Sequence, residues 1–172
     1  MKKILTILML CGFVYGYAQN TPPHAASTKT WTFGEQTWSD AIHIPECNKE
    51  EFTKSTIDPQ CRSYTKDGKT WYYYNWAYVQ KNQSKMCPPP WRVPTKSDSE
   101  TLASNTTLSA LSSVWGYGGY ADGSSIVNEN LYADYWSSTE NGSSAYYLGY
   151  YSGGLLVYSF DKYNGFQVRC VR

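Results

Sequence analysis

Four cysteines spread between residues 47 and 170 constrain the fold more than any other feature of this sequence. A fifth, Cys11, lies in an apolar N-terminal run and lacks the small preceding residue that a lipoprotein signal needs. In an exported chain, an even number of cysteines predicts disulfide bonds. Cys47, Cys61, Cys87 and Cys170 allow three pairings. A local Cys47–Cys61 loop with a long Cys87–Cys170 link is the most economical, and zinc is disfavoured because no CxxC pair is present.

The N-terminus has the organisation of a signal peptide. Lys2-Lys3 is followed by the apolar run Ile4–Val14, and small residues precede a cleavage point after Ala18. The run is too short to span a bilayer comfortably, and no later segment is apolar enough for a membrane span. We therefore predict residues 1–18 as a signal peptide, and a mature protein in the periplasm, on the outer surface or secreted.

Length and charge indicate one domain without a strongly charged partner. About 154 residues remain after cleavage, which suits a single core. The whole chain has 15 Lys and Arg against 14 Asp and Glu. Nucleic acids and anionic membranes are therefore poor partner candidates. The polar stretch 19–30 contains two prolines and predicts a flexible N-terminal tail, which leaves 31–172 as a single domain.

Local patterns predict short elements in the first half of this domain. Trp31–Trp38 alternates large apolar and polar residues around Gly34-Glu35, which predicts a short strand or hairpin. Cys47–Cys61 is polar and predicts a disulfide-closed loop, while Asp67-Gly68 predicts a turn. The aromatic run Trp71–Val79 predicts a strand that passes into a short helix.

Helices and then a loop are expected in the middle of the chain. Thr95 followed by Asp98 approximates a capping box and predicts a helix that continues to Asn105. A second short helix is predicted to begin at Leu108. Four glycines among residues 115–123 predict an irregular loop.

The last third of the chain predicts three antiparallel strands, Ala145–Tyr151, Leu155–Phe160 and Phe166–Val171, joined at glycine-containing turns. Side chains alternate between the faces of a strand. The predicted core face carries Tyr146, Leu148, Tyr150, Leu155 and Val157. The predicted exposed face carries Tyr147, Gly149, Tyr151, Leu156 and Tyr158. A register shift of one residue would exchange the two faces.

Tyrosine, serine and glycine dominate this region, as they do in antibody paratopes. We predict a ligand-binding surface formed by the exposed face and the preceding glycine-aromatic loop. Its residues are Tyr117, Tyr120, Ser143, Ser144, Tyr147, Tyr151, Ser152 and Tyr158. Strand propensity alone also enriches aromatic residues, so a purely structural use of these side chains stays open.

Three motifs resemble elements of the Fibrobacter succinogenes major paralogous domain family: Cys87–Thr95 (CPPPWRVPT), Tyr135–Glu140 (YWSSTE) and Gly165–Arg172 (GFQVRCVR). The likeness covers about residues 31–172. The family is similar to C-type lectin-like domains, so the resemblance implies an α+β fold with short helices, a small antiparallel sheet, long loops and two disulfides. It also implies the Cys87–Cys170 pairing, because both cysteines lie in family motifs. Pro89-Pro90 departs from the glycine usual in the family.

The resemblance implies an exported, cell-surface role and provides no catalytic residues. Some similar lectin-like proteins are targets of diversity-generating retroelements, which introduce Asn, Ser, Tyr and Gly near the end of the chain. The outward-facing positions of this sequence match that bias.

The residues present give little support for catalysis or metal binding. His24 falls in the predicted tail, and His43 alternates with isoleucines as a structural side chain does. A catalytic role would need His43 in a cleft beside a carboxylate. One oxygen-rich stretch offers ligands for a hard cation, although a solvated polar loop is the simpler interpretation. Its residues are Asp122, Asn128, Glu129, Asn130 and Asp134.

We therefore expect no cofactor and no metal. The predicted function is that of an exported, non-catalytic domain that binds a surface glycan or protein. The alternative is a structural subunit or tip of a bacterial cell-surface assembly.

Overall fold

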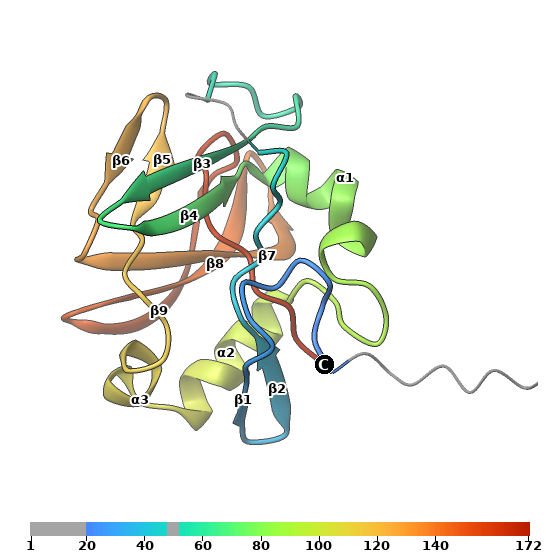
Figure 1. Ribbon diagram of the computed structural model, residues 1–172, viewed down its shortest axis with the longest axis vertical. Helices are drawn as coiled ribbons and strands as arrows, with labels where there is room; N and C mark the ends of the chain where they lie inside the picture. The colour runs from blue at the N-terminus through green and yellow to red at the C-terminus, as the bar shows by residue number, and fades with distance from the viewer. Residues whose placement is uncertain (1–19, 48–51) are drawn as a thin grey trace, which may run out of the picture.

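The computed structural model describes residues 20–47 and 52–172, so the predicted signal peptide lies outside the described residues. This part of the chain forms an α+β fold of short helices and small antiparallel sheets (Figure 1). The two-stranded sheets are β1 (Thr30–Phe33) with β2 (Gln36–Ser39), β3 (Cys61–Lys66) with β4 (Lys69–Tyr74), and β5 (Tyr120–Asp122) with β6 (Ser125–Val127). The helices are α1 (Trp76–Met86), α2 (Lys96–Asn105) and α3 (Leu108–Ser112). A three-stranded sheet has the order β7 (Tyr132–Asn141), β8 (Ser144–Tyr151) and β9 (Gly154–Asp161).

Left-handed backbone at the turns closes the first two hairpins. Gly34 has a φ of 60° between β1 and β2, where Trp31 pairs with Trp38. Asp67 and Gly68 have φ angles of 51° and 74° between β3 and β4. Glycine adopts this region without a steric penalty, and aspartate tolerates it. The predicted hairpin and the predicted Asp67-Gly68 turn are both confirmed.

Side-chain caps fix where the helices begin. Asn75 follows β4 and caps α1, because its side chain accepts a hydrogen bond of 2.9 Å from the backbone N–H of Tyr78. Thr95 and Asp98 bond each other's backbone N–H in a capping box at the start of α2. Thr107 caps α3 through its hydroxyl, which accepts a hydrogen bond from the backbone N–H of Ala110. The predicted strand-to-helix transition, the capping box and the second short helix are confirmed.

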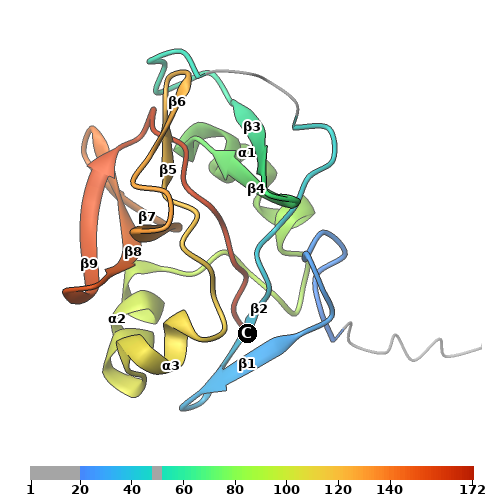
Figure 2. The ribbon, with the colours of Figure 1, turned by 60° about the vertical axis from the view of Figure 1, so that its left-hand side comes forward.

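The three-stranded sheet has the register predicted for its last two strands. Leu148 pairs with Val157, and Tyr150 pairs with Leu155. Their side chains lie in one apolar cluster with Trp115 and with residues of α2 and α3. Helix α2 contacts all three strands, and Figure 2 shows α2 and α3 together on one side of the sheet. The predicted core face is therefore confirmed at these four positions.

The third strand of this sheet is β7, and the prediction that Phe166–Val171 takes that place is wrong. This C-terminal segment runs through the middle of the molecule, where residues 164–171 are all buried (Figure 1). It forms single bridges with separate segments: Tyr74 with Phe166, Tyr135 with Gln167, Trp38 with Val171, and Arg92 with Val171. Alternating apolar residues are compatible with this central position and with a sheet strand alike. Which segments residues 166–171 pair with depends on contacts distant in sequence.

The glycine-rich loop predicted at 115–123 is only partly irregular. Tyr120–Asp122 forms β5, which pairs with β6, and Ala121 also exchanges backbone hydrogen bonds of 2.8 Å with Gly165 of the C-terminal segment. Gly119 has a φ of 64°, and a Cβ there would lie 2.2 Å from the carbonyl oxygen of Val127. The glycine is therefore required for the close approach between the loop and the end of β6.

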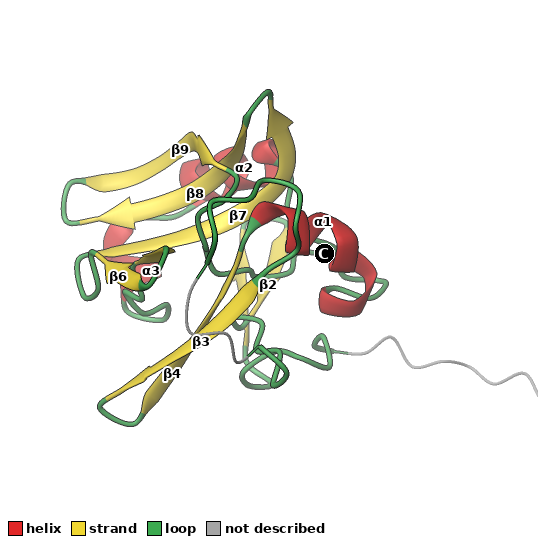
Figure 3. Ribbon diagram, turned by 90° about the horizontal axis from the view of Figure 1, so that it is seen from above, coloured by secondary structure: helices red, strands yellow, loops and turns green. Residues whose placement is uncertain are grey.

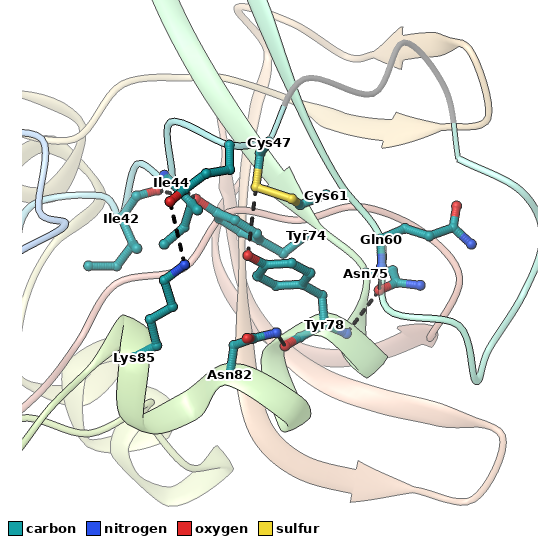
Figure 4. The surroundings of a disulfide bond; sticks show 11 residues. Ile42, Ile44, Cys47, Gln60, Cys61, Tyr74, Asn75, Tyr78, Asn82 and Lys85 are labelled. Carbon is teal, nitrogen blue, oxygen red and sulfur yellow. Dashed lines mark hydrogen bonds and ion pairs between the residues drawn. A yellow bond between two sulfur atoms is a disulfide. The ribbon is translucent and has the colours of Figure 1, made fainter.

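Disulfide bonds join Cys47 to Cys61 and Cys87 to Cys170, which is one of the three pairings that the sequence allows. The sequence separations are 14 and 83 residues. In the chain-entropy model such links contribute about 3 and 4.5 kcal/mol of stability. Figure 4 shows the shorter link, where the hydroxyl of Tyr78 lies 3.9 Å from Cys47 Sγ.

The described part of the predicted tail, residues 20–30, is bonded to the domain. The backbone N–H of Ala26 donates to the carbonyl of Ala41 at 2.8 Å, and that of His43 donates to His24 at 2.7 Å. These hydrogen bonds tie part of the predicted tail to the domain, and its flexibility stays a prediction. Polar composition alone does not reveal backbone hydrogen bonds of this kind.

Candidate ligand-binding face

The side of the β7–β8–β9 sheet that points away from α2 carries a group of aromatic residues. We call it the aromatic face. Figure 3 shows α2 lying against the other side of the three strands. Because the core residues point toward α2, alternation along each strand places their neighbours on the aromatic face. Its residues are Tyr132, Asp134, Tyr147, Gly149, Tyr151, Leu156, Tyr158 and Phe160.

Solvent reaches the three tyrosines predicted to bind ligand on this face. Tyr158 is 65% exposed, while Tyr147 and Tyr151 are half-buried. Tyr151 stacks on Tyr132 of β7, with ring centroids 5.2 Å apart and planes 7° apart. The structure thus brings Tyr147, Tyr151 and Tyr158 to one surface and seals none of them inside the protein.

A pocket of about 160 Å³ opens in the aromatic face. Tyr120 of β5, Tyr147 and Phe160 line it, and the ring of Phe160 lies 5.6 Å from that of Tyr120 and 6.3 Å from that of Tyr147. Burial raises the pKa of both tyrosine hydroxyls above the ordinary value. Both hydroxyls therefore stay protonated near neutral pH and are available as hydrogen-bond donors.

Asp134 also lines this pocket, and its carboxyl group has an unusual environment. The residue is 4% exposed, and burial raises the pKa of the carboxyl to about 7. Within the described part of the chain, no side chain or backbone N–H donates a hydrogen bond to the carboxyl. Buried polar groups usually have partners. The carboxyl is therefore an acceptor that a ligand in the pocket can satisfy.

The serines predicted in the site do not lie together. Ser143 and Ser144 lie at the turn between β7 and β8, whereas Ser152 follows the other end of β8. Eight residues of strand separate these positions by roughly 25 Å. One small ligand cannot contact both groups, and neither group lines the pocket.

Tyr117 and Tyr120 lie on opposite sides of the sheet. The ring of Tyr117 packs edge-to-face on Tyr150 at 5.0 Å, within the cluster that faces α2 and α3. Tyr117 therefore does not join the aromatic face, contrary to the prediction. The chain turns at Gly119 between the two tyrosines, and a composition-based prediction does not detect this change of side.

Several residues of the site escape prediction from sequence, among them Tyr132, Asp134 and Phe160. Tyr132 and Asp134 alternate with the buried Ala133, and this period-two pattern is the signal that places them on one face. Phe160 was expected in a strand but not in the site. Phe160 is 37% exposed because it lies near the end of the edge strand β9.

The fold brings together only two of the five residues of the oxygen-rich stretch, Asn128 and Asp134. Glu129 forms an ion pair of 2.8 Å with Lys66, and Asn128 and Asn130 adopt φ angles of 56° and 63° in a turn. Asn128 and Asp134 both line the aromatic-face pocket. Among residues 20–47 and 52–172, no group of three or more His, Cys, Asp or Glu side chains lies close enough to hold a metal ion.

His43 lies in a different cavity, together with Asp40. Its ring packs against Tyr72 at 4.6 Å, and burial lowers the pKa of His43. The carboxylate of Asp40 accepts hydrogen bonds from Ser27 and from the backbone of Ala41 at 2.6 and 2.8 Å. In the described residues the two side chains do not bond each other, so the His–carboxylate pairing of a general base is not formed.

Comparison with protein-family models, with curated proteins and with solved structures finds no match. Within residues 20–47 and 52–172, every helix is too short or too polar to span a bilayer.

Proposed function

We propose that this chain is an exported, non-catalytic binding domain that recognises a surface glycan through its aromatic face. The observation that carries the proposal is the carboxyl of Asp134, which accepts no hydrogen bond from the described residues and lies in a pocket lined by Tyr120 and Tyr147. Tyrosine rings stack on the apolar faces of sugar rings, and a carboxyl group accepts hydrogen bonds from sugar hydroxyls. The pocket of about 160 Å³ accommodates part of one sugar ring, while Tyr151 and Tyr158 extend the contact surface.

We also propose a C-type lectin-like fold and membership of the Fibrobacter succinogenes major paralogous domain family. The α+β architecture, the Cys87–Cys170 disulfide and the three ordered motifs support this assignment. Disulfides persist in oxidising compartments, and together with the predicted signal peptide they support a location outside the cytoplasm.

Neighbouring tyrosines on opposite faces of β8 provide a matched test. The double variant Tyr147→Ala/Tyr151→Ala removes two rings of the aromatic face, and Tyr146→Ala removes one from the α2 side, where Lys96 Nζ lies 4.9 Å from the Tyr146 ring. On an array that carries glycans and surface proteins, we expect the double variant to lose at least about tenfold in glycan binding, because aromatic residues dominate such contacts. Tyr146→Ala should retain it. Unchanged binding by the double variant would exclude this face, and binding to proteins alone would refute the glycan as ligand.

The edge strand β9 favours a second function, that of a subunit in a surface assembly. Within the described residues β9 pairs only with β8, so one of its edges is unpaired, and Tyr158 and Phe160 on this strand are exposed. Unpaired edges are sites for pairing with another chain. Sedimentation of the mature protein at micromolar concentration tests this function, since a single monomeric species contradicts self-assembly.

A further inference from the structure

A second cavity, of about 390 Å³, lies on the other side of the layer formed by β7 and the C-terminal segment. Along β7, Asp134 lines the aromatic-face pocket and Tyr135 lines this cavity. Along the C-terminal segment, Phe166 lines the aromatic-face pocket and Gln167 lines this cavity. Consecutive residues of an extended chain point to opposite sides. The two recesses are therefore separate sites, and a ligand in one does not occupy the other.

Arg169 gives this cavity a fixed positive group. The residue is 3% exposed, and its guanidinium carbon lies 4.1 Å from the ring of Trp115 and 5.1 Å from the ring of Tyr135. One nitrogen, Nη1, donates to the carbonyl of Ser39 at 2.9 Å and to the carboxylate of Asp40 at 3.3 Å. The buried Nε makes no hydrogen bond within the described residues. The guanidinium is thus held in place while part of its donor capacity stays unused.

Gln167 adds a second unused donor to the same wall. The residue is 4% exposed, and its Nε2 is buried without a hydrogen-bond partner among the described residues. A Cβ at Gly118 would lie 2.5 Å from this Nε2 and 2.6 Å from Cδ1 of Trp71. Gly118 therefore allows the amide and the indole ring to approach each other closely beside the cavity.

The charge and chemistry of the lining favour a negatively charged ligand that accepts hydrogen bonds. Lys69 and Arg169 contribute two positive charges against the one negative charge of Asp40, whose carboxylate already accepts three hydrogen bonds. The unpartnered atoms of the wall are donors, and leaving buried donors without partners is unfavourable. A carboxylate supplies two acceptor oxygens and matches the planar guanidinium. The rings of Trp71 and Tyr135 offer apolar surface for the rest of such a molecule.

We propose that this cavity binds a small carboxylate-bearing molecule of the size of one hexuronate, with Arg169 and Gln167 donating to the carboxylate. Lys69, an exposed residue at the start of β4, adds attraction at the entrance. The volume lies within the range of about 300–1,000 Å³ that is usual for small-molecule sites. The site is independent of the glycan-binding proposal, because it uses none of the residues of the aromatic face.

Titration of the ¹⁵N-labelled mature chain tests the proposal directly. Glucuronate, glucose and N-acetylglycine are added in turn, and the side-chain resonances of Arg169 Nε–H and Gln167 Nε2–H₂ are followed. We expect glucuronate to shift both resonances with a Kd of about 1 mM or below, and glucose to bind at least about tenfold more weakly. Equal binding of N-acetylglycine also supports the site and assigns its selectivity to the carboxylate alone. Equal binding of glucose and glucuronate, or no shift with either acid, overturns the proposal.

Two charge reversals on exposed lysines provide the matched comparison. Lys69→Glu at the cavity should weaken glucuronate binding about fivefold, whereas Lys81→Glu on α1 makes the same change in net charge away from the site and should leave binding unchanged. Gln167→Glu replaces the unpartnered donor with a like charge and should abolish binding. Lys69 is exposed, so its variant reports on the site even where Gln167→Glu fails to fold. Equal effects of the two lysine variants contradict the proposal.

Discussion

Asp134 lies directly opposite Gly149 in the β7–β8 register, and the absence of a side chain at Gly149 leaves the space that the carboxyl occupies. A Cβ at Gly149 would lie 2.9 Å from Asp134 Oδ1 and 3.0 Å from Cδ1 of Leu156. Both neighbours are held within the sheet. The position of the buried acid therefore depends on the glycine.

Gly149→Ala should displace Asp134 and lower the free energy of unfolding by about 1–3 kcal/mol, because added atoms in a packed site force neighbouring groups to move. Urea unfolding measures the effect. Gly116→Ala is the control, since nothing lies within 4 Å of a Cβ at that position and its φ is not in the left-handed region. We expect that variant to stay within about 0.5 kcal/mol of wild type. Equal losses in both variants would contradict the dependence of Asp134 on Gly149.

Asp134→Asn should change how stability depends on pH. Burial raises the pKa of Asp134 from 3.8 to about 7 in the folded state. The wild-type carboxyl is protonated in both states below pH 3.8 and ionised in both above about pH 7, so its burial becomes more unfavourable between these values. The full effect at pH 8 is up to about 4 kcal/mol. We expect the variant to gain stability over wild type between pH 5 and pH 8 in urea unfolding. Parallel pH profiles for the two proteins would refute the raised pKa.

Asp98→Asn should destabilise the protein with the opposite pH dependence. Burial alone would raise the pKa of Asp98, but hydrogen bonds from Arg92 and Thr95 outweigh it and lower the pKa from 3.8 to about 2. The carboxylate therefore contributes about 2 kcal/mol above pH 3.8, and this contribution is lost as the pH falls toward 2. Thermal unfolding at pH 7 and pH 2.5 should show the difference from wild type shrinking at the lower pH. Glu100→Gln, on the exposed side of α2, should change stability little at either pH.

Removal of each disulfide should have unequal effects. Replacement of Cys47 and Cys61 by serine should lower the free energy of unfolding by about 3 kcal/mol, and replacement of Cys87 and Cys170 by about 4.5 kcal/mol or more. The longer link closes a larger loop, and Cys87 and Cys170 are 3% and 0% exposed, within the core. Urea unfolding of the two double variants measures the order. A larger loss for the shorter link would contradict the loop-length argument.

Local rules predicted much of this fold. The hairpin turns, the capping box of α2 and the pairing of Tyr150 with Leu155 follow from residues close together in sequence. The prediction for Phe166–Val171 failed because alternation shows which side chains share a face of a strand, but not which segments the strand pairs with. Pairing with Tyr74 and Arg92 depends on contacts about 80 to 90 residues away, which no local pattern encodes.

The site was predictable to a similar extent. Alternation placed Tyr147, Tyr151 and Tyr158 on one surface, because all three lie in regular strands with one register. It could not predict that Asp134 would lie among them, since that depends on which strand pairs with β8. Nor could it separate Tyr117 from Tyr120, because the chain crosses from one side of the sheet to the other at Gly119.

The central position of residues 166–171 has a consequence for the growing polypeptide. Every helix and strand of the described chain precedes this segment, yet bridges from Trp38, Tyr74, Arg92 and Tyr135 all end on it. A nascent chain that has not yet reached Phe166 lacks the common partner of these segments and cannot close its interior. The interior of the domain can therefore close only after this segment has been synthesised.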